Sequence, residues 1–371
     1  MHKGKIIRVF AGVNTPEGFR SFAGDALWPL QRVVVIKGGP GCGQSSLIGV
    51  VARSMVERGY DVELWQGALS PDAAEGVVIP HLGVAVVDGS AFEAIEPQYP
   101  GVRDEIINLG EYWNEQQLRR HADEIRQLTD DLADRIGKVR RQLGECAGVQ
   151  CRLGQIYGGT LSEAELMRIC RGLAEEIFGE QQLRIRRFFS GAVGIDGWES
   201  TAQQLSSACR RRWLVYGPSG EAVSAALEEM QRQAVSRGHN VDLYYSCFRP
   251  DQLEMVIIPG ASVALIDSSL PDLEPMLCDR LLKLADLPGE DAAEEDAARE
   301  NAAREEILEE RWQEELAAAV ADADAAWHLY ERLEGFYRAA MDHTQVDAAA
   351  KALLEKIWSM AAEREDEQAG I

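Results

Sequence analysis

An internal repeat at one constant offset is the feature that most constrains this fold. When the sequence is shifted by 179 residues, residues 8–90 align with residues 187–269 without a gap, and 26 of the 83 aligned pairs are identical, about 31%. Arg58–Leu64, for example, meets Arg237–Leu243. Chance similarity does not hold one register over such a length. The chain therefore contains two copies of one structural unit.

Each copy has the sequence pattern of an α/β domain. A short apolar run, at 33–36 and again at 213–215, precedes a Gly-rich turn. A segment with helical periodicity follows, at 45–58 and 224–237, and each segment ends at a glycine. In the first copy, further strands are predicted at 62–64, 77–79 and 84–87. Strands that alternate with helices indicate a largely parallel sheet covered on both faces.

A long helical segment follows each copy. Apolar residues in both segments recur at the spacing that places them on one helix face, and the second stripe continues beyond a turn near Asp342. We expect each segment to form an antiparallel helical hairpin, or arm. The predicted organisation is a first domain at 1–113, an arm at 114–185, a second domain at 186–287 and an acidic arm at 288–371.

Charge and composition exclude several classes of protein. The 38 basic residues are outnumbered by 61 acidic ones, giving a net charge of −23, so a polyanionic partner such as nucleic acid or an anionic membrane would be repelled. The longest strand-like apolar run has four residues, far below the ~20 that a membrane span needs. Seven cysteines without CxxC pairs argue against a disulfide framework or a zinc site. We therefore expect a cytoplasmic protein.

The Gly-rich turn of the first copy is the strongest candidate site. It matches the pattern G-x-x-x-x-G-K-[ST] at Gly38, Gly43 and Ser45, with Gln44 at the lysine position. Glycines let consecutive backbone N–H groups turn towards a phosphate, and the following helix adds the positive end of its dipole. The predicted nucleotide-binding residues are Gly38, Gly39, Gly41, Cys42, Gly43, Gln44, Ser45 and Ser46.

Two further side chains extend this hypothesis to metal binding and catalysis. Ser45 and Asp88 are the predicted Mg²⁺ ligands, since Asp88 ends a predicted strand in the position of the acid that holds the metal through water. The alternative for Asp88 is an ordinary residue of a strand-end turn. Glu75 is the candidate that polarises water for hydrolysis, and a surface carboxylate without a catalytic role is the alternative reading.

At these residues the chain resembles a family of bacterial tandem P-loop ATPases, which have two P-loop halves. The resemblance covers nearly the whole chain, including both arms. It implies a cytoplasmic protein that binds ATP or GTP with Mg²⁺, but it transfers no physiological substrate. The residues that carry it are Phe10–Phe19, Lys37–Ser46, Arg58–Glu63, Gly76–Pro80, Asp88–Gly89, Tyr99–Gly101, Asp104–Gly110 and, more weakly, Gly217–Ser224 and Val256–Asp267.

The chain departs from the family at its most diagnostic position. Family members carry G-x-P-G-x-G-K-S, whereas Gln44 replaces the lysine here. A glutamine amide donates hydrogen bonds but supplies no charge, and losing a cation from the transition state slows a reaction by a factor on the order of 10²–10³. Lys37 lies before Gly38, at the expected strand end, where it is either a substitute cation or an exposed side chain.

The second loop, Gly217–Ser224, departs further from the pattern. It has Ala222 for the second glycine and Val223 for the lysine, and Glu221 is expected to repel a phosphate. Nucleotide binding is therefore expected only in the first copy. Two functions remain open: a P-loop NTPase-like protein that binds nucleotide with weak or absent hydrolysis, and a non-catalytic scaffold that binds a protein partner through its acidic arms.

Overall fold

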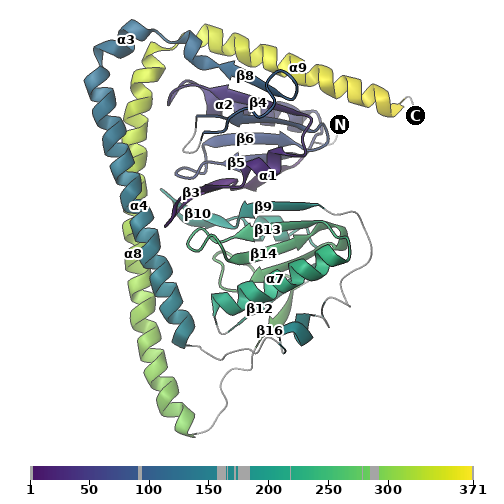
Figure 1. Ribbon diagram of the computed structural model, residues 1–371, viewed down its shortest axis with the longest axis vertical. Helices are drawn as coiled ribbons and strands as arrows, with labels where there is room; N and C mark the ends of the chain where they lie inside the picture. Colours follow the sequence, from purple (N-terminus) through teal and green to yellow (C-terminus); the bar gives the residue numbers. More distant parts are fainter. Residues whose placement is uncertain are drawn as a thin grey trace. The chain divides into compact units, whose positions relative to one another are not determined.

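The computed structural model shows two α/β repeats and long helices (Figure 1). It describes residues 3–90, 94–156, 164, 166–170, 173, 184–217, 219–277, 279–284 and 292–369. Contacts group the chain into two compact units. The first unit comprises Met1–Ala11, Ser21–Gly137 and Ala323–Ile371, and the second comprises Gly12–Arg20 and Lys138–Asp322. No helix among the described residues is long and apolar enough to cross a membrane.

The two repeats have the same elements in the same order. The first contains β1 (Ile6–Val9), β2 (Gly12–Thr15), β3 (Gly18–Ser21), α1 (Ala23–Leu27), β4 (Arg32–Lys37), α2 (Gln44–Glu57), β5 (Val62–Gln66), β6 (Ala74–Ile79), β7 (Val84–Asp88) and β8 (Asp104–Asn108). The second contains β9 (Ile185–Phe189), β10 (Gly191–Gly194), β11 (Gly197–Ser200), α6 (Ala202–Ser206), β12 (Arg211–Tyr216), α7 (Gly220–Ser236), β13 (Val241–Tyr245), β14 (Leu253–Ile258), β15 (Val263–Asp267) and β16 (Asp279–Lys283).

The strand order confirms the duplication. The first six-stranded sheet has the order β1-β5-β6-β7-β4-β8, and the second has the corresponding order β9-β13-β14-β15-β12-β16. Even the irregularity in the ladder recurs, because the register shifts at Trp65/Gln66 in one sheet and at Tyr244/Tyr245 in the other. The α/β class with two tandem sheets is therefore as predicted.

The sheets are mixed rather than purely parallel. β6 runs antiparallel to both β5 and β7, and β14 does the same in the second sheet. Connection length gives the reason. Only residues 67–73 join β5 to β6, and only residues 80–83 join β6 to β7. A parallel connection needs a crossover of a dozen or more residues, so these short links force antiparallel pairing.

Long helices account for most of the remaining described chain. They are α4 (Ala122–Ile156), α8 (Ala292–Ala340) and α9 (His343–Ala369), with the short helix α3 (Glu115–Arg120) and the 3₁₀ turns η1 (Leu109–Tyr112) and η2 (Pro259–Ala261). The turn expected near Asp342 is confirmed, because it separates α8 from α9. The return helix expected in the first arm falls largely outside the described residues.

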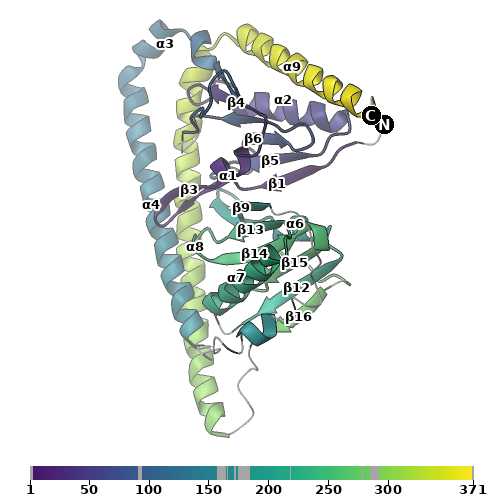
Figure 2. The ribbon, with the colours of Figure 1, turned by 45° about the vertical axis from the view of Figure 1, so that its right-hand side comes forward.

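The helix after the turn does not form the expected hairpin with α8. Instead α9 packs on α2 and joins the core of the first sheet, which includes Ile36, Ile48, Met55, Leu353 and Ile357. Figure 2 shows α9 leaving the end of α8 and running along α2. The apolar residues of α9 are buried against the α/β layer, so the hairpin prediction for 288–371 is wrong on this point.

The last part of α8 also belongs to the first unit. There it runs beside the start of α4, where the His121 and Phe336 rings lie 4.9 Å apart between centroids. The backbone N–H of Asn114 donates to the carbonyl of Ala340 at 2.8 Å, and Gln117 Nε2 donates to the carbonyl of Ala339 at 3.1 Å. These contacts place residues 336–340 beside α3 and the start of α4.

Candidate phosphate-binding loop

The first Gly-rich loop spans residues 38–43, between the end of β4 and the start of α2. Gly41 and Gly43 have φ values of +71° and +105°, which only glycine adopts readily. Gly43 is also the residue that precedes α2, and no side chain caps the helix there. The first N–H groups of α2 are thus left for another acceptor, as in a helix terminus that binds an anion.

Gln44 does not project from the loop. Its side chain is buried, and its Nε2 donates to the backbone carbonyl of Gly39 at 3.0 Å. The amide therefore holds the two ends of the loop together. A glutamine used in this way gives one of its two amide N–H donors to the loop backbone and supplies no charge to a phosphate.

Ser45 uses its hydroxyl for a structural contact. Its Oγ accepts a hydrogen bond from the backbone N–H of Ala74 at 2.9 Å, which ties α2 to the start of β6. The second repeat has the same contact, since the Oγ of Ser224 accepts from the N–H of Leu253 at 2.9 Å. The neighbouring Ser46 is exposed. The serine at this position thus joins helix and strand in both repeats, including the one whose loop has lost the nucleotide-binding pattern.

Asp88 lies where the sequence pattern predicted, at the end of the strand next to the loop strand. In the ladder between β4 and β7 it pairs with Ile36, and its carboxylate accepts from the N–H of Ser90 at 2.8 Å. Burial raises the pKa of Asp88 to about 6, while the Lys37 charge acts in the opposite direction.

Lys37 Nζ itself donates to the carbonyl of Gly89 at 2.8 Å and pairs with Glu96 at 2.7 Å. Both of these Lys37 contacts are with residues that follow β7, so its charge is directed to that end of the sheet and does not replace the missing loop lysine.

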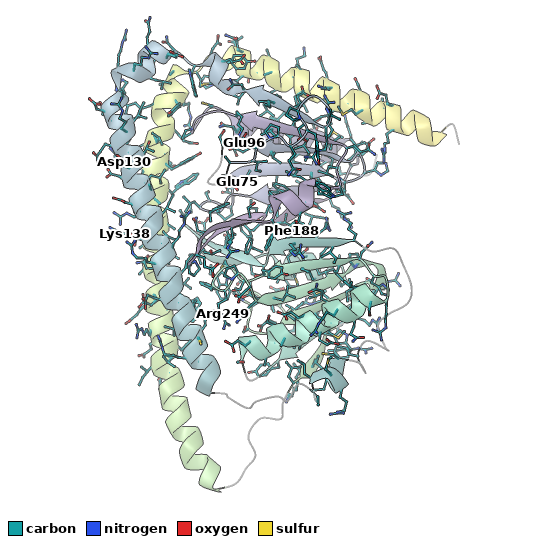
Figure 3. All side chains as sticks on the ribbon, viewed as in Figure 1. Glu75, Glu96, Asp130, Lys138, Phe188 and Arg249 are labelled. Atoms are coloured by element: carbon teal, nitrogen blue, oxygen red, sulfur yellow. The ribbon has the colours of Figure 1, made fainter. Side chains whose placement is uncertain are left out.

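Glu75, the predicted water-polarising residue, stands on β6 and is labelled in Figure 3. Burial raises its pKa to about 8, and the charge of Asp88 acts in the same direction. A carboxylate oxygen accepts from the N–H of Ala68 at 3.3 Å. With that pKa, Glu75 is mostly protonated at neutral pH. A protonated carboxyl cannot accept a proton from water, so its surroundings do not favour a general base.

Residues of α8 and α9 cover the loop, a contact that the sequence did not predict. A Cβ atom added to Gly39 would lie 2.5 Å from Cε1 of Tyr337, and one added to Gly41 would lie 2.8 Å from the carbonyl oxygen of Glu334. The Glu334 carboxylate pairs with Arg338 at 2.9 Å; burial raises its pKa, and the Arg338 charge and the nearby Gly41 N–H act in the opposite direction. The sequence placed Tyr337 on the apolar stripe of an arm. Periodicity shows which face of a helix is buried but not what buries it.

Cys42, the remaining predicted loop residue, is buried within this packing. Burial raises the pKa of its thiol to about 11, and the nearby Asp88 and Glu334 carboxylates add to the rise. The thiol is therefore protonated at neutral pH and unreactive. Its side chain belongs to the core under the loop.

The second loop has become part of a helix. α7 begins at Gly220, the equivalent of Gly41, and so starts three residues earlier than α2. Ser219 caps it, because its Oγ accepts from the N–H of Ala222 at 3.2 Å. Glu221 lies in the first turn, where an acid is favoured by the helix dipole. No glycine-lined cradle is left for Glu221 to block.

Comparison of the chain with protein-family models, curated protein sequences and solved structures finds no match. Within the described part of the chain, no group of three or more His, Cys, Asp and Glu side chains is arranged to hold a metal ion. The geometry of the first loop and its surroundings therefore carries the functional argument alone.

Proposed function

We propose that the first repeat is a P-loop NTPase-like domain that binds ATP or GTP with Mg²⁺ at residues 38–46, and that hydrolysis is slow or absent. The observation that carries this proposal is the uncapped start of α2 behind a loop whose Gly41 and Gly43 have left-handed backbone conformations. Such a loop directs backbone N–H groups towards an anion.

The surrounding residues fit a triphosphate better than they fit its hydrolysis. Ser45 and Asp88 would supply protein oxygens to Mg²⁺, which usually keeps several waters and binds substrate phosphates through few side chains. Gln44 adds no charge to the phosphates, and Glu75 is mostly protonated at neutral pH. Both facts favour binding without efficient turnover.

A scaffold function is the second candidate, and a specific observation favours it. The functional groups that would face a nucleotide already have partners inside the chain: Gln44 binds Gly39, and Ser45 binds Ala74. A protein that only kept the fold would show the same contacts. In that case the acidic helices, and not the loop, would bind the partner.

Replacing Gln44 with lysine tests the nucleotide-binding proposal. The Gln44→Lys variant should bind Mg²⁺–ATP about tenfold more tightly than the parent, because a charge-assisted contact is roughly twice as strong as a neutral hydrogen bond. Calorimetric titration with and without Mg²⁺ measures the affinity, and a phosphate-release assay measures turnover.

The control for this experiment is Gln116→Lys, which adds the same charge at an exposed position of α3, outside residues 38–46. It should change the affinity by less than about twofold, since an exposed charge interacts weakly. If Gln44→Lys binds no better than Gln116→Lys, the loop cannot form a phosphate cradle, and the scaffold function replaces nucleotide binding.

A further inference from the structure

The carboxylate of Glu334 and the ring of Tyr337, both on α8, lie on the first Gly-rich loop. We propose that these two residues form an autoinhibitory latch, in which Glu334 packs against Gly41 and the Tyr337 ring closes the space over Gly39. Phosphate then binds only after this part of α8 moves away. The inference rests on the proposed function, because it concerns the regulation of the same loop.

The contact with Gly41 is the chemical basis of the latch. The carbonyl oxygen, Cβ and Cα of Glu334 would lie 2.8, 2.9 and 3.0 Å from a Cβ added to Gly41. Burial raises the pKa of the Glu334 carboxyl group, while the Gly41 N–H is close enough to lower it slightly. A carboxylate oxygen and a phosphate oxygen are both anionic acceptors. A bound phosphate therefore competes with Glu334 at this part of the loop.

Steric closure adds to this competition. The Tyr337 ring comes so near to Gly39 that a single added carbon would lie 2.5 Å from Cε1, and the backbone of Glu334 approaches Gly41 almost as closely. A phosphate group is much larger than one carbon atom. These surfaces of the loop are accessible only when residues 334–337 have moved.

Negative charge around the loop opposes phosphate binding while the latch is closed. Burial raises the pKa of the Cys42 thiol and that of the Tyr330 hydroxyl, and the carboxylates of Glu334 and Asp88 add to both rises. These two acids therefore act on one small region. Lys37 and Arg338 face it as cations, paired with Glu96 and with Glu334 respectively. A phosphate entering beside Glu334 would add to this negative charge.

A glycine within the latch, Gly335, makes α8 locally less stable. Gly335 is exposed, and a Cβ atom added to it would meet nothing within 4 Å, so packing does not require a glycine there. Glycine inside a helix is destabilising by roughly 1 kcal/mol relative to alanine. Gly335 directly follows Glu334 and comes two residues before Tyr337, so it lies in the helical turn that carries both side chains.

Two variants change the latch in opposite directions and form the test. In the Gln44→Lys background, Glu334→Ala should bind inorganic tripolyphosphate about tenfold more tightly, because the competing anion is lost. Gly335→Ala should bind it roughly threefold more weakly, because the helix that carries the latch is more stable. Calorimetry at fixed pH and salt measures both.

Glu331→Gln is the matched control. It removes one negative charge from the exposed face of the same helix, where Glu331 contacts His328 at 3.2 Å. Its affinity should stay within about twofold of the background. Hydrogen exchange should also show that residues 330–340 of the background protein lose protection when tripolyphosphate binds.

The outcomes separate the two proposals. If the Gln44→Lys protein binds tripolyphosphate but Glu334→Ala gives no gain beyond that of Glu331→Gln, the latch is wrong and the proposed function stands. If residues 330–340 stay fully protected in the bound state, the latch is also wrong. If no variant binds tripolyphosphate or Mg²⁺–ATP, both proposals fall together.

Discussion

The two Gly-rich segments of this chain started from equivalent places in one fold and now differ in local structure. In the first repeat, α2 begins only after the left-handed Gly43, and no side chain caps it. In the second, Ala222 and Val223 replace Gly43 and Gln44, α7 starts three residues earlier, and Ser219 caps it. Removing the need for a left-handed residue lets the loop wind into the first turn of the helix. The glycine therefore preserves the loop, independently of any ligand.

The groups around the two segments differ in charge as well as in shape. In the first repeat, the acids Glu75 and Asp88 lie near the loop, and Glu334 of α8 contacts it. In the second, Arg249, labelled in Figure 3, lies at the start of α7, where its Nη2 would be 2.5 Å from a Cβ added to Gly220. Burial raises the pKa values of Glu254 and Asp267, and serine hydrogen bonds followed by the Arg249 charge partly offset this rise. The cation that acts on the buried acids is thus Arg249 in the second repeat and Lys37, which acts on Asp88, in the first.

The largest expected effect that separates the repeats is a dependence of stability on pH. Burial raises the pKa of Glu75 to about 8 and that of Glu254 to about 7. The folded protein binds each proton more tightly than the unfolded chain does. The stabilisation is therefore complete below the usual pKa near 4.5 and is lost as the pH rises through the folded-state value.

Hydrogen exchange of the strand amides measures this loss separately in each repeat. Between pH 5 and 8, the free energy of opening of β6 should fall by an amount on the order of 3 kcal/mol, and Glu75→Gln should remove most of the fall. For β14, the decrease should end near pH 7, and Glu254→Gln should remove it. Equal pH ranges for the two strands would show that the hydrogen bonds from Ser190 and Ser246, together with the Arg249 charge, do not lower the pKa of Glu254.

The second largest effect concerns Gly41 and Gly220, the equivalent glycines of the two segments. Gly41→Ala should destabilise the first unit by about 2 kcal/mol, because the left-handed backbone strains alanine and the new Cβ meets the backbone of Glu334. Gly220→Ala should change stability by less than about 0.5 kcal/mol, because it meets only the flexible end of Arg249. Thermal unfolding of each variant decides between them, and equal losses would contradict the proposed difference in local structure.

The smallest effect should be the same in both repeats. Ser45→Ala and Ser224→Ala each leave a backbone N–H without its acceptor, so each should cost about 1 kcal/mol. Denaturant unfolding without Mg²⁺ measures the loss. A clearly smaller cost for Ser45→Ala would show that the hydroxyl of the first repeat is not committed to Ala74 and is available to a metal ion.

The sequence predicted what depends on local pattern and failed where distant segments meet. The offset of 179 residues predicted a repeated fold, and the identical strand orders confirm it. The pattern did not predict the antiparallel β6, although the short links 67–73 and 80–83 already implied it. Asp88 lies at the predicted strand end. The partners of α9 and of Glu334 could not be predicted, because a helical stripe does not specify the surface it covers.

Glu334 and the Gly-rich loop belong to one polypeptide chain, and this affects how phosphate binding at the loop depends on concentration. A competing group on the same chain acts at an effective concentration set by the fold that holds it in place, and it is not diluted with the protein. A soluble phosphate compound therefore competes against a constant that does not change with the amount of protein. Occupancy of the first loop would then depend on the absolute concentration of the free phosphate compound, and the loop would act as a concentration gauge.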